Sequence, residues 1–387
     1  MKRPTIVQFN LSPTLGGAEV YTAFFSRALE ARGWPTRVVV SPNARFWGDL
    51  DFGGVVRSPL RQGAGALQRG DIALIHASLP GAELAKCKGH FVAGLAHQAL
   101  YDGTRPAYYD RADLLLAVSA HVATSLRRNG LDRVHPAPLY GVAELERAGT
   151  MGGIVEGALF DADARKPRDR AMAALHRAGR AVAAPRRFER RGGLTLGIVS
   201  RLAPLKQFPA LFERLVPVLA RHPGVNVEIF GSAVGYKALA AVRRAVSALG
   251  QRVRFWGHQR DVASAYRAID YLLTGLPERE ALGLNAIESC FAGTPVLAID
   301  APPFCETMKN GVTGFLYADP RDDGGADFER VLTGIEEGAL SVDRDAAIGH
   351  LEAFSFGRFA DRVDAAMEAV AAGARRAPDH GRLGQGA

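Results

Sequence analysis

The sequence predicts an α/β protein of two doubly wound domains, each a parallel β-sheet covered by helices on both faces. The chain has 387 residues, more than a single hydrophobic core usually organises, so two domains are expected. Short, continuously apolar segments alternate with helical ones, which is typical of parallel strands buried on both faces. This alternation stops at a basic stretch and restarts after it, so we place the domain boundary near residue 192.

The first predicted domain, residues 1–192, opens with a strand over 5–11, a turn containing glycine and an amphipathic helix. Gly33 follows this helix, at the position where a glycine commonly ends one. Further strands are predicted over residues 35–42, 71–78, 90–97 and 112–119. The last helical stretch of the chain, 357–376, is expected to return to this domain.

The second predicted domain, residues 193–356, repeats the alternation. Its strands are predicted over residues 194–202, 225–232, 252–258, 270–276 and 294–300. The polar tail beyond it, 377–387, is expected to be disordered. Because open α/β sheets bind ligands at the carboxyl ends of their strands, we expect functional residues in the loops that follow strands.

The composition narrows the class of protein. A hydrophobic content of 48% and a charged content of 23% are those of a soluble globular protein. No apolar run approaches the ~18 residues of a membrane span, and the N-terminal apolar stretch is too short for a secretory signal. Three scattered cysteines, Cys87, Cys290 and Cys305, form neither a disulfide framework nor a metal-binding spacing, so the cytoplasm is the expected compartment.

The net charge of +8 is concentrated in the basic segment, residues 151–192. Its ten basic residues are Arg165, Lys166, Arg168, Arg170, Arg177, Arg180, Arg186, Arg187, Arg190 and Arg191. Such a segment attracts anionic lipid headgroups or a phosphorylated substrate, and a solvated basic helix is the alternative. No aromatic interleaving and no nucleic-acid-binding motif accompany these charges, so we expect no nucleic-acid partner.

Two loops that follow predicted strands carry features suited to phosphates. Gly16 and Gly17, in the stretch LGGAEVY, lie between the first strand and the first helix, where backbone N–H groups can meet an anion; a tight turn without a ligand is the alternative. The spacing lacks the third glycine of a dinucleotide fingerprint, which disfavours an NAD-dependent dehydrogenase. Arg201 and Lys206, in SRLAPLK, follow the first strand of the second domain and suit a diphosphate, unless they are solvated surface charges.

The stretch PEREALGLNAIESCFAGTPV contains two glutamates, which suggest an acid/base pair, two surface charges or two acceptors for ligand hydroxyls. Glu280 is expected in a loop and Glu288 inside the helix that follows, so they are better placed to hold different parts of one ligand. Gly283 would let the backbone approach this ligand. The N–H groups of Leu284 and Asn285 would point towards it from the helix start.

Two of the histidines, His76 and His97, fall at or just after predicted strand ends in the first domain. A histidine is more often structural than catalytic, and this interpretation is kept for five others: His90, His121, His135, His222 and His258. His97 precedes the loop-forming sequence QALYDG, which places it at the edge where a ligand would bind.

In combination, these motifs resemble the retaining GT-B glycosyltransferases of family four, the glycosyl transferases group 1. The resemblance is carried by GGAE, RLAPLK, IFGS, EREALGLNAIESCFAGTPV and CETMKNGVTGFL, and is strongest over residues 194–320. It implies a GT-B fold, with two Rossmann-like domains facing each other across a cleft. It also implies that a nucleotide sugar binds mainly to the second domain and an acceptor to the first.

The resemblance further implies roles for individual residues. Arg201 and Lys206 match the pair that binds the donor diphosphate, and Glu288 matches the glutamate that accepts hydrogen bonds from the ribose. Glu280 matches the glutamate that contacts the donor sugar, and His97 the histidine beside donor and acceptor, so these two are assigned to the catalytic centre. Five further residues are expected near the diphosphate: Gly16, Gly17, Gly283, Leu284 and Asn285.

Members of this family transfer sugar with retention and without a metal or another cofactor. The implied donor is a UDP- or GDP-sugar. The implied acceptor is a glycan or a lipid-linked glycan of bacterial envelope, capsular or exopolysaccharide biosynthesis, which suggests a peripheral position on the inner face of the cytoplasmic membrane. Two alternatives remain open, a GT-B nucleotide-sugar epimerase and a non-catalytic nucleotide-sugar binding protein.

The sequence departs from the family in two places. Ala281 and Leu282 stand where members usually have an aromatic residue before the Gly-Leu of the motif, which alters the expected floor of the sugar pocket. The stretch from 142 to 192 is longer and more basic than the usual interdomain connection, which suits a membrane- or acceptor-facing element.

Overall fold

The structure, a computed structural model, describes most of the chain and divides it into two compact units. The described residues are 3–42, 44–60, 67–101, 103–143, 153–160, 170–171, 174–175, 178 and 186–376. The first unit comprises residues 1–142 and 354–387, and the second comprises 143–353. The tail predicted to be disordered, 377–387, lies outside the described residues.

The first unit is a six-stranded parallel sheet with the strand order β3-β2-β1-β4-β5-β6. The strands are β1 Ile6–Asn10, β2 Thr36–Val40, β3 Val56–Pro59, β4 Ile72–Ile75, β5 Phe91–Ala96 and β6 Leu114–Ala117. The helices named here are α1 Gly17–Ala31, α2 Gly81–Lys86, α3 Ala107–Arg111, α4 Ala120–Arg128 and α14 Phe356–Arg376. Strands β1 and β4 are fully buried and β2 is buried over Val38–Val40, as expected for a sheet covered on both faces.

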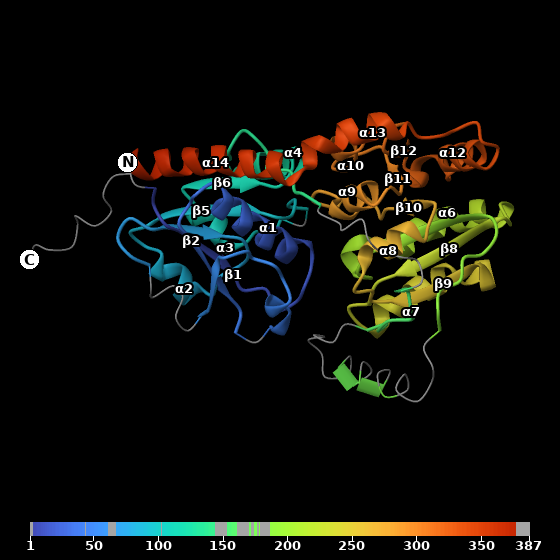
Figure 1. Ribbon diagram of the computed structural model, residues 1–387, viewed down its shortest axis with the longest axis horizontal. Helices are drawn as coiled ribbons and strands as arrows, with labels where there is room; N and C mark the ends of the chain where they lie inside the picture. Colours follow the sequence, from blue (N-terminus) through green and yellow to red (C-terminus); the bar gives the residue numbers. More distant parts are fainter. Residues whose placement is uncertain are drawn as a thin grey trace, which may run out of the picture. The chain divides into compact units, whose positions relative to one another are not determined.

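The C-terminal helix α14 packs in the first unit, beside α1 (Figure 1). Its buried face includes Phe359 and Val363, and the Phe359 ring meets the Tyr21 ring of α1 edge-on at 5.3 Å. Asp364 accepts hydrogen bonds from Trp34 Nε1 at 2.8 Å and Arg3 Nη2 at 3.1 Å. Apolar contacts and these polar bonds therefore join the end of the chain to its beginning.

The second unit repeats this architecture, with the strand order β12-β11-β10-β7-β8-β9 in a six-stranded parallel sheet. The strands are β7 Leu194–Val199, β8 Val225–Phe230, β9 Val253–Gly257, β10 Tyr271–Leu273, β11 Val296–Ile299 and β12 Gly314–Tyr317. The helices are α6 Phe208–Arg221, α7 Tyr236–Ala245, α8 Val262–Arg267, α9 Leu284–Phe291, α10 Phe304–Thr307, α11 Pro320–Asp323, α12 Ala326–Glu336 and α13 Arg344–Leu351.

The predicted fold class is confirmed, because both units are doubly wound parallel sheets with the same connectivity. In each sheet the chain starts in a central strand, winds to one edge, and then returns to fill the other half. The direction of winding changes between β1 and β4 in the first unit and between β7 and β10 in the second. At such a switch point the loops after two neighbouring strands diverge, which makes the carboxyl edge of these strands the expected ligand site.

The contacts of the chain draw the boundary between units at residue 142, not near 192 as the sequence analysis places it. The described parts of the intervening stretch group with the second unit because their apolar side chains enter its core. Ile154 is buried with the residues around Trp256, and Phe160 forms a bridge with Ala233. The Phe188 ring meets that of Trp256 at 5.2 Å.

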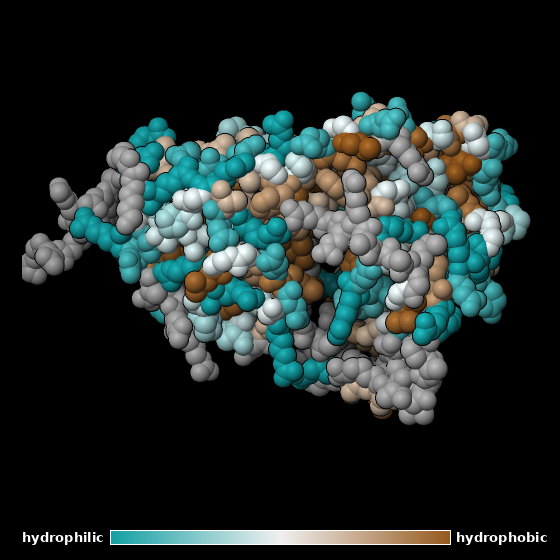
Figure 2. Space-filling view, viewed as in Figure 1, coloured by the Kyte–Doolittle hydropathy of each residue, from teal (hydrophilic) through white to brown (hydrophobic). Residues whose placement is uncertain are grey.

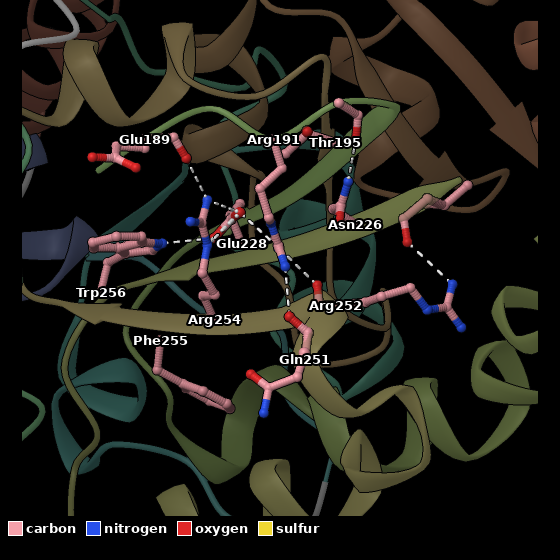
Figure 3. A network of polar contacts seen from close by, with 12 residues as sticks. Glu189, Arg191, Thr195, Asn226, Glu228, Gln251, Arg252, Arg254, Phe255 and Trp256 are labelled. Atoms are coloured by element: carbon pink, nitrogen blue, oxygen red, sulfur yellow. Dashed lines mark hydrogen bonds and ion pairs between the residues drawn. The ribbon is translucent and has the colours of Figure 1, made fainter. Parts of the chain in front are cut away.

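A buried carboxylate also holds this stretch to the second unit. Figure 3 shows Glu228 of β8 surrounded by donors from β9 and from the chain ahead of β7. Its side chain is 1% exposed; Trp256 Nε1 donates to it at 2.6 Å, Arg254 Nε at 2.9 Å and Arg191 Nη2 at 2.8 Å. Arg191, part of the basic segment, is therefore bound within the unit and is not a solvated charge.

The face of the molecule in Figure 2 is mostly hydrophilic, with apolar side chains interspersed. Large exposed apolar side chains, such as Val56 and Ile348, are scattered over several elements, which is usual for protein surfaces. Within the described residues, no helix combines the length and the apolar character needed to cross a membrane.

Candidate functional site

The switch point of the second unit brings together the two loops that the sequence analysis singles out. Lys206 lies in a short 3-10 helix, Pro204–Lys206, on the loop after β7, and Glu280 lies on the loop after the neighbouring strand β10. The Lys206 Nζ donates a hydrogen bond to Glu280 Oε2 and forms an ion pair with it. Two residues far apart in sequence thus meet at the carboxyl edge of the sheet.

Close backbone packing makes this meeting possible. A Cβ added at Gly275, just beyond β10, would lie 2.3 Å from the carbonyl oxygen of Lys206. Only glycine therefore allows the loop after β10 to pass the Lys206 backbone at this distance. Gln207, the residue after Lys206, has a φ of 54°, a left-handed conformation that is uncommon for a residue other than glycine. The backbone around Lys206 is thus fixed by its close contact with Gly275 and by the left-handed conformation of Gln207.

The environment of Glu280 keeps it ionised although it is largely buried. Burial by itself raises the pKa of this carboxyl, but the Lys206 ammonium and two backbone N–H groups outweigh burial and hold the pKa below its ordinary value. The N–H groups belong to Ala281, at 3.2 Å, and Gly283, at 3.3 Å. An ionised carboxylate is a hydrogen-bond acceptor only, so Glu280 suits ligand hydroxyls better than a proton donor's role.

Gly283 caps the start of helix α9 in a conformation that favours glycine. Its φ is 73°, and an added Cβ would lie 2.9 Å from the ring of Phe304. The N–H groups of Ala286 and Ile287 are the first to bond back to the Gly283 carbonyl. Leu284 and Asn285 precede them, so their N–H groups lie at the positive end of the helix, where an anion is favoured.

We expect Gly283→Ala to displace the start of α9 and to destabilise the second unit by about 1–2 kcal/mol, through left-handed strain and the clash with Phe304. Thermal unfolding of the variant measures the loss. Gly311→Ala is the control, because Gly311 has a φ of 75° and open space around its Cβ position. Equal losses in the two variants would show that contact with Phe304 does not matter.

Glu288 lies further along α9 and is held by a tyrosine that the sequence analysis does not single out. The Tyr266 hydroxyl, from α8, donates to Glu288 Oε2 at 2.7 Å. Burial raises the pKa of Glu288, and the hydrogen bond from Tyr266 and the charge of Lys206 offset only part of this effect. Tyr266 was missed because an aromatic residue on a helix shows no spacing that separates a polar contact from core packing.

The remaining predicted residues of the second unit occupy the same edge. Arg201 is half-buried on the loop that leads from β7 to Lys206. Asn285 Nδ2 reaches the carbonyl of Val199, the last residue of β7, at 3.5 Å, which joins the start of α9 to this strand. The substituted position Leu282 is buried, so it packs inside the unit, whereas Ala281 is half-buried.

The first unit carries the other predicted residues at the carboxyl edge of its own sheet. Gly16 caps α1 with extended backbone torsions, and an added Cβ at Gly17 would have no neighbour within 4 Å. Neither backbone strain at Gly16 nor crowding at Gly17 within the unit therefore demands glycine. His97 follows β5; it lies half-buried, its ring edge-on to that of Tyr21 at 5.1 Å, and burial lowers its pKa to about 3.

Two doubly wound units of this kind define the GT-B fold, and comparison with solved structures agrees. Anabaena HepE, solved in complex with UDP and glucose, superposes with a TM-score of 0.67 at 17% identity, covering 95% of this chain and 100% of that one. The pneumococcal O-GlcNAc transferase GtfA, solved with UDP and GlcNAc, gives 0.66 at 11% identity over 96% and 99% of the two chains. At these identities the likeness concerns the fold.

Within this fold, residues 193–332 match the sequence model of the family described as Glycosyl transferases group 1, the family that these comparisons support. Two curated relatives are D-inositol 3-phosphate glycosyltransferases. That of Actinosynnema mirum is 29% identical over 184 residues, 45% of this chain and 43% of the relative. That of Nocardia farcinica is 33% identical over 182 residues, 43% of this chain and 38% of the relative. The matched part thus spans less than half the length of either relative.

Proposed function

We propose that this protein is a retaining glycosyltransferase of family four that moves a sugar from a nucleotide-sugar donor to a glycan or lipid-linked acceptor. The observation that carries the proposal is the cluster at the switch point of the second unit. The positive charge of Lys206 acts there to lower the pKa of both Glu280 and Glu288, and α9 begins between the two glutamates. Cations, backbone amides and ionised acceptors at one sheet edge match an anionic ligand with many hydroxyls.

Each group has a distinct task in the proposed complex. Lys206 and Arg201 neutralise the donor diphosphate, together with the N–H groups at the start of α9. Glu288 accepts from the ribose hydroxyls and Glu280 from those of the donor sugar. The printed titles of the structural neighbours, which name UDP with glucose or GlcNAc, favour a UDP-sugar as the donor.

The proposed reaction breaks the bond between the anomeric carbon and the diphosphate and forms one to the acceptor oxygen on the same face. The electron pair of the broken bond leaves with the diphosphate, and the fixed cations and amides stabilise the charge that develops there. The acceptor hydroxyl proton passes to the leaving phosphate oxygen. No metal and no further cofactor is assigned a step. His97, on the first unit, is proposed to contact the hydroxyls of the sugar or the acceptor.

A two-stage experiment tests the proposal. A thermal-shift screen against UDP-, GDP-, ADP- and dTDP-sugars identifies the donor, because a ligand of the native state raises the apparent stability. The stabilising donor is then incubated alone and with acceptors, including D-inositol 3-phosphate, the substrate named in the curated relatives. An acceptor-bound sugar with retained anomeric configuration by NMR supports the proposal. Conversion of the donor to another sugar nucleotide in the absence of acceptor indicates an epimerase. A donor that binds and stays unchanged in every incubation indicates a binding protein.

We expect Tyr266→Phe to weaken donor binding most at acidic pH. Removing the hydroxyl takes away the hydrogen bond that lowers the pKa of Glu288, so this pKa rises further above its ordinary value. An ionised Glu288 accepts from the ribose more strongly than a protonated one, because protonation turns one of its two oxygens into a donor. The pH below which donor affinity falls is therefore expected to be higher in Tyr266→Phe. Calorimetric titration of the donor between about pH 5 and 8 measures this shift.

Tyr317→Phe is the matched control for this variant. The Tyr317 hydroxyl is buried in β12 and has no hydrogen-bond partner among the described residues, so its removal breaks no bond. The donor affinity of Tyr317→Phe is expected to follow that of the unaltered protein at every pH. A shift of the fall in affinity to higher pH in Tyr317→Phe, or no such shift in Tyr266→Phe, would contradict the role given to Tyr266.

We also propose that the basic segment contacts anionic membrane lipids. Five of its basic residues lie outside the described residues: Arg165, Lys166, Arg168, Arg177 and Arg180. Others are engaged within the second unit, since Arg190 pairs with Asp270 and Arg191 with Glu228. In a flotation experiment, the protein is expected to rise with vesicles that contain anionic lipid. Replacing the five residues by alanine is expected to abolish this binding. Flotation that does not depend on them would remove the proposal.

A further inference from the structure

A chain of buried polar side chains runs through the first unit to His97, and the proposed function assigns it no task. Gln8, in β1, is 0% exposed and His76, just after β4, is 3% exposed. Gln8 Oε1 lies 3.0 Å from His76 Nε2, and His76 Nδ1 lies 3.3 Å from His97 Nε2. The two imidazole rings are stacked with centroids 5.6 Å apart. A buried network of this kind is costly unless every donor meets an acceptor, so its hydrogens can be assigned.

The orientation of the Gln8 amide follows from two hydroxyls. Ser26 and Thr36 each donate their hydrogen to a backbone carbonyl, at 2.8 and 2.9 Å. A hydroxyl has one hydrogen, so both oxygens accept from Gln8 Nε2, which lies 3.0 Å from each. The other end of the amide, Oε1, is therefore an acceptor turned towards His76.

The tautomers of both histidines follow from this orientation. His76 Nε2 carries a hydrogen because it faces the Gln8 carbonyl oxygen, and burial lowers the pKa of His76, so its Nδ1 is bare. Thr22 Oγ1 lies 3.4 Å from this Nδ1 but donates its hydrogen to the Ala18 carbonyl at 2.8 Å. The hydrogen between the rings therefore belongs to His97 Nε2. His97 Nδ1 is left as an acceptor.

We propose that Gln8 and His76 are positioning residues that hold His97 as its Nε2–H tautomer and present its Nδ1 to a substrate hydroxyl as a hydrogen-bond acceptor. The identity of that hydroxyl, on the sugar or the acceptor, rests on the proposed function. The position of His97 supports the inference, since the residue is half-buried just beyond the carboxyl end of β5, at the edge where such sheets bind ligands.

The consequence of losing this control is specific. A neutral imidazole that is free to exchange tautomers carries its hydrogen on Nδ1 for part of the time. While Nδ1 carries the hydrogen, it cannot accept a hydrogen bond from a hydroxyl. A substrate that needs an acceptor at this position then meets the correct ring only in a fraction of molecules. Burial lowers the pKa of His97 to about 3, so protonation does not compete with this choice near neutral pH.

Nitrogen NMR of the full-length protein labelled with 15N-histidine tests the tautomer without any substrate. In the unaltered protein, His97 is expected to show a protonated Nε2 and a bare Nδ1 between about pH 6 and 8. Gln8→Leu is expected to give a mixture of tautomers at both rings, whereas Asn226→Leu, which removes a buried amide of the second unit, keeps the single form. A protonated Nδ1 on His97 in the unaltered protein would overturn the proposal, and so would an unchanged tautomer in Gln8→Leu.

Kinetics with the donor found by thermal shift test the consequence. Since one hydrogen bond contributes about 1 kcal/mol and about 1.36 kcal/mol corresponds to a tenfold change in rate, kcat of Gln8→Leu is expected to fall roughly fivefold, with little change in the donor KM. Asn226→Leu is the control for removing a buried amide, because Asn226 is the second residue of β8 and its side chain donates to the Gly192 carbonyl at 2.8 Å. An unchanged kcat in Gln8→Leu overturns the positioning role. Absence of transfer from every donor overturns the proposed function, while the NMR result still decides the tautomer.

Discussion

Replacing Lys206 by methionine is expected to weaken binding of the sugar-nucleotide donor by roughly 10- to 150-fold. A hydrogen bond to a charged group contributes about 1.5–3 kcal/mol, and methionine keeps the length of the side chain while removing the ammonium. The same change deprives Glu280 of its ion-pair partner at a site where its side chain is only 14% exposed. Calorimetric titration of Lys206→Met with the donor measures the affinity.

Lys309→Met is the control for loss of a lysine charge from the second unit. Lys309 is exposed on the loop before β12, and its described hydrogen bonds use the backbone. Its donor affinity is expected to match that of the unaltered protein. A similar loss of affinity in both variants would indicate a general effect of net charge, and an unchanged affinity in Lys206→Met would contradict the diphosphate site.

The ion pair also predicts how stability changes with pH. The folded-state pKa of Glu280 lies below its ordinary value of 4.5, so the contribution of the pair is complete at neutral pH and is lost as the pH falls through the folded-state value. In Lys206→Met, burial without the ammonium raises this pKa instead. The difference in unfolding free energy between the two proteins is therefore expected to be largest near pH 7 and to shrink towards pH 4. A difference that does not vary with pH would count against the pair.

Glu228→Ala is expected to destabilise the second unit by about 3–5 kcal/mol, the usual result of removing one partner from a buried ion pair. The variant leaves Arg191, Arg254 and the Trp256 indole without the acceptor that they share in Figure 3. Since Arg191 belongs to the segment before β7, the variant also loses the ion pair that attaches this segment to β8. Urea unfolding followed by Trp fluorescence measures the change.

Glu329→Ala is the comparison for Glu228→Ala because it also removes a glutamate paired with arginine in the second unit. Glu329, on α12, pairs with Arg221 at the surface, where their side chains are 31% and 55% exposed. Solvent and salt screen such a pair, so a far smaller loss of stability is expected. Glu228→Gln, which keeps the shape and one acceptor, should fall between the two. Losses of similar size in Glu228→Ala and Glu329→Ala would show that burial of the pair does not matter.

Several features of this fold are visible in the sequence because they depend on local patterns. A strand such as β8 is apolar along its whole length, which marks it as the interior of a parallel sheet. Strand β3, Val56–Pro59, was missed because it lies at the edge of its sheet with mostly exposed side chains. Strand β12 was missed because it opens with Gly314, directly after a turn over residues 311–313. The boundary predicted near residue 192 was placed from the distribution of charge. The boundary in the structure, at residue 142, is set by contacts of apolar residues such as Phe160, which lie among the charges of this basic segment.

The class of fold and the candidate donor-site residues could be predicted from the sequence, because these residues lie in loops after strands or in the helix that follows such a loop, and most are charged or glycine. Which of these residues contact one another is visible only in the folded chain. The contact of Lys206 with Glu280, and those of Tyr266 with Glu288 and of Gln8 with His76, join elements far apart in the chain. Such pairs depend on strand order and on the direction of individual side chains, and neither property leaves a periodic pattern in the sequence.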